Sequence, residues 1–215
     1  YLFATAYRMI NTVCGKESME RVNFLLREMV VGELAEETEK FRLVSIERYL
    51  ARIEKKTARF FQVAAELGCS FAARPQVVRL AAGEFGRELG MAYQLFDDLQ
   101  DLTGDSQTGG KPVFQDLKNG VLTLPLLLIS DQPGFGELLQ EVRAEGKVGA
   151  KHQKRIRCWL TAAGVPREVE QLIDKYRRRA KERIAGLNLP QSSLLHDFVD
   201  CFLEPGGKRK KTSHG

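Results

Sequence analysis

The sequence predicts an all-α protein, because apolar residues recur at helical spacing along almost its whole length. No alternation of apolar and polar residues, the pattern of a half-buried strand, continues for more than a few positions. Serine or proline precedes several of the apolar stretches, where helices commonly begin. A chain of 215 residues fits one domain and can bury a large core, so we expect one bundle of helices.

Four helices are predicted in the first half of the chain, each with a signal at one or both ends. They are residues 1–13 (ended near Gly15), 18–39 (capped by Ser18), 46–67 (capped by Ser45 and ended by Gly68) and 75–102 (opened by Pro75). Residues 103–120 are rich in glycine and are expected to form a loop. The later helices are expected after Thr123-Leu124-Pro125, within 131–147, and at 150–163, 167–186 and 192–203.

Composition narrows the class of protein. The chain is 43% hydrophobic and 28% charged, as in ordinary soluble proteins, and it lacks an apolar run long enough for stable membrane insertion. Lys208, Arg209, Lys210 and Lys211 supply four of the +5 net charge, so the rest of the chain is near +1 and no nucleic-acid partner is expected. The four cysteines are far apart, which favours reduced core thiols in a cytoplasmic protein.

The two ends of the chain differ from the body. The tail, residues 205–215, is basic and rich in glycine, and we expect it to be disordered. Residues 1–204 are expected to form one helical domain. The chain opens directly on an apolar helix without an N-cap, so we expect this domain to be partial, with N-terminal helices missing before Tyr1.

Three aspartates stand at the end of the fourth predicted helix: Asp97, Asp98 and Asp101. The C-terminal end of a helix carries partial negative charge, so acidic side chains are disfavoured there. Asp97 and Asp101 are four residues apart and share a face, so they also repel each other. Clustered carboxylates suit Mg²⁺, which prefers oxygen ligands and shares its shell with substrate phosphates. A solvated acidic helix end is the alternative.

Two lysines are candidates for binding a phosphate group. Lys56-Thr57 interrupts the apolar face of the third predicted helix, which suggests a polar cavity beside the core. Lys111 lies in the loop about ten residues after the aspartates, where an ammonium group could bind a metal-bound diphosphate. The alternatives are a threonine that bonds to its own helix and a solvated surface lysine.

These motifs together resemble those of the trans-polyprenyl diphosphate synthase family, especially its long-chain heptaprenyl, hexaprenyl and octaprenyl diphosphate synthases. Tyr93-Gln94-x-x-Asp97-Asp98-x-x-Asp101 resembles the second aspartate-rich motif of this family. Gly110-Lys111-Pro112-x-x-x-Asp116-Leu117 is similar to the segment that follows the motif, and Lys56-Thr57 to the lysine–threonine site. The order and spacing of all these motifs match over residues 1–203.

The resemblance implies an isoprenoid-synthase-type bundle of long helices around a central cavity. It implies a prenyltransferase that condenses an allylic diphosphate with isopentenyl diphosphate, after Mg²⁺-dependent ionisation of the allylic substrate. By this likeness Mg²⁺ is bound by Asp97, Asp98 and Asp101. The substrate would be bound by Lys56, Thr57, Gln94, Lys111 and Lys118, with the first four of these in catalytic roles. The resemblance also implies a homodimer, or a heterodimer with a second synthase subunit.

The sequence departs from the family pattern in three ways. The first aspartate-rich motif is absent from these 215 residues, so we expect this segment alone to be inactive. Glu36 stands where many long-chain members have glutamine, and Val121 where many have a basic residue. Two other functions therefore stay open: a non-catalytic subunit that binds or regulates a partner synthase, and another terpenoid synthase on the same fold.

Overall fold

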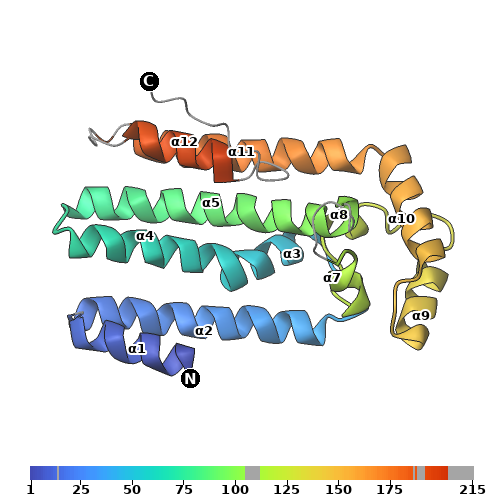
Figure 1. Cartoon of the computed structure of the whole chain (residues 1–215), viewed down its shortest axis with the longest axis horizontal. Helices are drawn as coiled ribbons and strands as arrows, with labels where there is room; N and C mark the ends of the chain where they lie inside the picture. The colour runs from blue at the N-terminus through green and yellow to red at the C-terminus, as the bar shows by residue number, and fades with distance from the viewer. Residues whose placement is uncertain (14, 105–111, 186, 188–191, 203–215) are drawn as a thin grey trace.

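The helices lie roughly side by side in layers (Figure 1). This computed structural model describes residues 1–13, 15–104, 112–185, 187 and 192–202, and these contain helices and no strand. The tail expected to be disordered, residues 205–215, and the candidate Lys111 lie outside the described residues. None of the described helices is both long enough and apolar enough to cross a membrane. The all-α prediction is confirmed.

Most of the predicted helices are present, with shifted ends. The first half contains α1 (Leu2–Val13), α2 (Lys16–Thr38), α3 (Ile46–Ile53), the π-helical turn η1 (Glu54–Ala58), α4 (Arg59–Phe71) and α5 (Gln76–Thr103). The second half contains α7 (Gln115–Lys118), α8 (Leu124–Leu127), α9 (Phe135–Glu145), α10 (Ala150–Ala162), α11 (Val165–Ala185) and α12 (Ser192–Phe202).

Two predicted helix ends and the placement of the cysteines were wrong. Gly15, not Ser18, stands at the N-cap of α2, whereas the side chain of Ser45 does cap α3 by accepting from the backbone N–H of Arg48. The helix predicted to stop at Gly68 continues to Phe71, because the carbonyl oxygen of Gly68 still accepts a helical hydrogen bond, from the backbone N–H of Ala72 at 3.1 Å. Cys158 and Cys201 are exposed and free, so they are not core thiols.

The longest helix, α5, forms the centre of the bundle. It packs along α4 on one side and along α11 on the other, and α2 lies against η1 and α4 (Figure 1). Leu95, Leu99 and Leu102 on α5 are fully or almost fully buried and belong to a core cluster that continues into α8, α9, α10 and α11. The aspartate-bearing end of α5 is therefore anchored in this core cluster.

A buried ion pair connects the end of α2 to the same region. Arg52 and Glu39 are 4% and 5% exposed, and Arg52 Nη1 lies 2.6 Å from Glu39 Oε2. Arg52 Nη2 also donates to the carbonyl oxygen of Leu122, just before α8, at 3.1 Å. Since breaking a buried pair leaves an uncompensated charge, these bonds hold α2, α3 and α8 in register.

The turn η1 carries Lys56 and Thr57 and lies between two glycines. A Cβ atom on Gly32 of α2 would lie 2.9 Å from the backbone nitrogen of Lys56. A Cβ atom on Gly90 of α5 would lie 2.7 Å from the Cα atom of Ala58. Both distances are below ordinary van der Waals contact, so only glycine allows α2 and α5 to approach η1 this closely. Single π-helical turns are rare and occur frequently at functional sites.

We predict that replacing Gly90 with alanine will destabilise the protein by about 1–3 kcal/mol, the usual cost of overpacking. The added methyl group meets backbone rather than a flexible side chain, so η1 must shift. Gly68→Ala is the matched control: Gly68 also lies inside a helix but has nothing within 4 Å. The control should gain about 0.5–1 kcal/mol from helix propensity. Urea denaturation compares the two, and equal stability would contradict this account of the contact.

Candidate metal and diphosphate site

The three aspartates at the end of α5 have different surroundings. Asp97 is exposed, Asp98 is only 2% exposed, and Asp101 is partly buried. From the sequence, Asp97 and Asp101 were expected on one face with Asp98 beside them, and all three were predicted to bind the metal. The structure instead leaves Asp97 open to solvent while burying its neighbour in the helix–helix contact.

Both carboxylate oxygens of Asp98 accept hydrogen bonds inside the bundle. The hydroxyl group of Tyr49, on α3, donates to Oδ2, and Nε2 of Gln94 donates to Oδ1 at 2.7 Å. Burial raises the pKa of Asp98 to about 7, although the two hydrogen bonds act in the opposite direction. The charges of Asp116 and Asp97 raise it further. Asp98 is thus held by protein groups on both oxygens.

Asp101 orders the short helix α7. Its side chain accepts from the backbone N–H groups of Gln115 and Asp116, at 2.9 and 3.3 Å, and its carbonyl oxygen accepts from Phe114 at 2.7 Å. Burial raises the pKa of Asp101, and the two N–H donors oppose this shift. These bonds place α7 beside the end of α5. Residues 105–111, between the two helices in the sequence, are not described.

This folding-back adds Asp116, which was not among the predicted site residues. Burial and three negative neighbours raise the pKa of Asp116 to about 6; the neighbours are Asp101, Asp97 and Glu36. Asp116 stands within the sequence segment that follows the aspartates, but nothing in its spacing indicated that α7 would bring it back to them. The acidic site therefore consists of Asp97, Asp101 and Asp116, with Asp98 beneath it.

Lys56, on η1, lies near this site. Its Nζ atom is 2.6 Å from Glu36 Oε1 and 3.2 Å from Glu33 Oε2, both on α2. Burial opposes the charge of Lys56, but the bonds and charges of Glu36 and Glu33 outweigh it and raise the pKa of Lys56. The positive charge of Lys56 also acts on Asp116 and lowers its pKa. Lys56 and the acidic site are therefore within range of each other's charge.

Thr57 connects η1 to α5. Its hydroxyl group donates to Oε1 of Gln94 at 2.7 Å, although the two residues are 37 positions apart.

The structure brings together five of the eight predicted site residues: Thr57 on η1, and Gln94, Asp97, Asp98 and Asp101 on α5. Lys56 on η1 is a sixth, because its charge acts on Asp116 beside them. Lys118 is exposed at the end of α7, and its side chain makes no hydrogen bond or ion pair with the described residues. Lys111 lies outside them.

The donor set suits a divalent cation that shares its shell with a ligand. Within residues 1–104 and 112–202, as far as they are described, no three His, Cys, Asp or Glu side chains are grouped closely enough to hold a metal by themselves. Asp97, Asp101 and Asp116 offer carboxylate oxygens, the ligand type that Mg²⁺ prefers. Carboxylates that raise one another's pKa are stabilised by such a cation, and phosphate oxygens would complete its shell.

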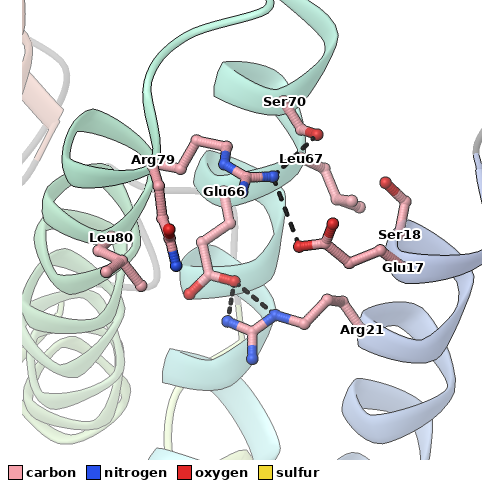
Figure 2. A pocket seen from close by; sticks show the side chains of 9 residues that line it. Glu17, Ser18, Arg21, Glu66, Leu67, Ser70, Arg79 and Leu80 are labelled. Carbon is pink, nitrogen blue, oxygen red and sulfur yellow. Dashed lines mark hydrogen bonds and ion pairs between the residues drawn. The ribbon is translucent and has the colours of Figure 1, made fainter.

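A polar pocket of about 230 Å³ lies far from this site, at the start of α5 (Figure 2). Arg21 is bonded to Glu66, and Arg79 lies 3.5 Å from Glu17 and from Ser70 (Figure 2). Leu80 at the pocket and Asp97 are 17 residues apart on one helix, or roughly 26 Å at 1.5 Å per residue. This pocket is therefore separate from the acidic site.

This chain is similar in sequence to known proteins. A family model described as polyprenyl synthetase matches residues 1–157. Heptaprenyl diphosphate synthase component 2 of Bacillus subtilis is 29% identical over 146 residues, which are 67% of this chain and 42% of that protein. Nonaprenyl diphosphate synthase of Mycobacterium tuberculosis is 34% identical over 206 residues, which are 93% of this chain and 60% of that protein.

Solved structures show the same fold. A polyprenyl synthase from Caulobacter crescentus, complexed with calcium and isoprenyl diphosphate, has a TM-score of 0.85 at 26% identity, covering 95% of this chain and 64% of that one. Heptaprenyl diphosphate synthase from Staphylococcus aureus has a TM-score of 0.85 at 25% identity, covering 95% and 65%. These matches confirm the isoprenoid-synthase-type helical fold. The chain spans less than two thirds of the length of each of these four proteins. It belongs to the polyprenyl synthetase family.

Proposed function

We propose that this chain provides a metal and diphosphate site of a polyprenyl diphosphate synthase, which condenses an allylic diphosphate with isopentenyl diphosphate. The observation that carries the proposal is the 2.7 Å hydrogen bond between Thr57 and Gln94. It joins the lysine–threonine turn to the aspartate-bearing helix, two motifs that are far apart in the sequence. The relatives named as diphosphate synthases support the same activity.

In this proposal the site residues have separate roles in binding the metal, the diphosphate and the reacting end of the substrate. Asp97 and Asp101 hold Mg²⁺, with Asp116 beside them, and the bound metal supplies positive charge to the leaving diphosphate. Lys56 binds diphosphate oxygens from the opposite side, and Lys111 and Lys118 stay candidates for the same task by family likeness. Thr57 and Gln94 line the reacting end of the substrate. Asp98, which is only 2% exposed, is assigned a supporting role instead of metal binding.

A partner subunit belongs to the proposal. Two relatives are named as component 2 of heptaprenyl diphosphate synthase, which supports an assembly with a second component. The first aspartate-rich motif, absent from this sequence, would then come from the rest of the protein or from the partner. A homodimer is the other arrangement.

We predict that Asp97→Ala abolishes Mg²⁺-dependent binding of inorganic diphosphate, because Asp97 is the exposed carboxylate of the site. The fold should be retained, or slightly stabilised as repulsion between carboxylates is relieved. Isothermal titration calorimetry with Mg²⁺ and inorganic diphosphate measures the binding. Asp197→Ala, which removes an exposed carboxylate on α12, is the control and should bind as the natural protein does. Undiminished binding to the Asp97 variant would refute the metal assignment.

We also predict that Glu36→Gln strengthens diphosphate binding. Glu36 is the nearer of the two carboxylates that hold Lys56, and its charge also raises the pKa of Asp116. Removing that charge leaves Lys56 freer to bind phosphate oxygens, a gain of roughly fivefold in affinity for about 1 kcal/mol.

Glu37→Gln is the matched control for this variant, since Glu37 is the next residue on α2 and pairs with Lys40 instead. Its diphosphate affinity should be unchanged. Weaker binding in the Glu36 variant would show that Glu36 contributes a required oxygen rather than competing for Lys56. The same calorimetric titration gives both answers.

A further inference from the structure

Four side chains form a continuous chain of hydrogen bonds from the core to the reacting end of the site. The chain runs from Tyr49 on α3 to Asp98 and Gln94 on α5, and ends at Thr57 on η1. The first two members are buried, with exposed fractions of 0% for Tyr49 and 2% for Asp98. The proposed chemistry does not by itself require either of them.

The direction of each bond follows from counting protons. A carboxylate is only an acceptor, so Tyr49 and the NH₂ group of Gln94 must donate to Asp98. The amide oxygen of Gln94 then faces Thr57, which must donate its single hydroxyl proton to it. Thr57 is left with oxygen lone pairs alone to offer to the substrate.

Burial keeps this direction from reversing. The hydroxyl group of Tyr49 is fully buried and donates its proton to Asp98. A buried polar group left without a partner costs about 1–3 kcal/mol, so any other arrangement of these protons is disfavoured.

We propose that Tyr49 and Asp98 are positioning residues, which fix the amide of Gln94 and so present the hydroxyl group of Thr57 to the substrate as a hydrogen-bond acceptor. An acceptor at this place stabilises the positive charge that develops on the allylic carbon as diphosphate leaves. This inference rests on the proposed function. It accounts for a carboxylate within the aspartate motif that is buried and accepts hydrogen bonds from Tyr49 and Gln94.

Asp98→Asn tests the inference, because it should reverse the direction of the chain while keeping every bond. The oxygen of the new amide can still accept from Tyr49, and its NH₂ group then faces Gln94. Gln94 must turn its oxygen toward position 98 and its NH₂ group toward Thr57. Thr57 then accepts this bond, and its own proton points to the substrate, which is unfavourable beside a developing cation.

The variant is made in the complete natural protein and assayed with an allylic diphosphate, isopentenyl diphosphate and Mg²⁺. We expect a roughly tenfold to hundredfold fall in kcat, the range for one charge-assisted hydrogen bond, with KM for the allylic substrate nearly unchanged. Thermal stability should be equal or higher, because a buried charge is removed.

Binding of inorganic diphosphate with Mg²⁺ separates this inference from the metal assignment. The Asp98 variant should retain that binding, whereas Asp97→Ala should lose it. Loss of binding in the Asp98 variant would overturn the inference by making Asp98 a metal ligand. Unchanged kcat would overturn it by showing that the direction of the bonds does not matter. A natural protein without turnover would instead refute the proposed function.

A double variant tests whether the effect passes through Thr57. Thr57→Val removes the hydroxyl group at similar volume and should lower kcat by itself, while Thr57→Ser keeps the hydroxyl group and should retain most activity. Adding Thr57→Val to Asp98→Asn should cause little further loss in kcat if both act through one hydroxyl group. If the fall in kcat of the double variant equals the product of the falls in the two single variants, the proposed series of hydrogen bonds is overturned.

Discussion

The close contact of η1 with the helices on both sides of it determines where Lys56 and Thr57 lie. Gly32 on α2 and Gly90 on α5 allow backbone to approach backbone, at distances that a Cβ atom would not permit. This contact sets Thr57 against Gln94 on one side and Lys56 against Glu36 on the other. A shift of η1 by the width of a methyl group would separate both pairs, and positioning errors of about 1 Å can cost enzymes a hundredfold in rate.

The same packing explains why adjacent aspartates differ. Successive residues of a helix point in directions about 100° apart, so one of two neighbours can face the core while the other faces solvent. Asp98 faces Tyr49 in the contact between α3 and α5, and its charge is tolerated there because both oxygens accept hydrogen bonds. Asp97 faces outward beside Asp101 and Asp116, where repulsion among carboxylates favours a divalent cation.

The sequence was sufficient for the fold class, for most of the helices and for the motifs, because these depend on local periodicity and on short patterns. The π-helical turn could not be predicted, since it arises from packing against glycines on two other helices. The buried state of Asp98 and the arrival of Asp116 likewise depend on contacts between distant segments. Gly68 was taken as a helix end because glycine commonly stands there, but the packing of α4 along α5 overrides that local preference.

The most direct test of this account is the position of a bound metal. Crystals of the complete protein with Mn²⁺ and inorganic diphosphate would locate the metal by its anomalous scattering, since Mn²⁺ accepts the same oxygen ligands as Mg²⁺. We predict a metal bonded to the carboxylate of Asp97 and to diphosphate oxygens, with Asp98 still hydrogen-bonded to Tyr49 and Gln94. A metal bonded to Asp98, with its bond to Tyr49 broken, would contradict the account.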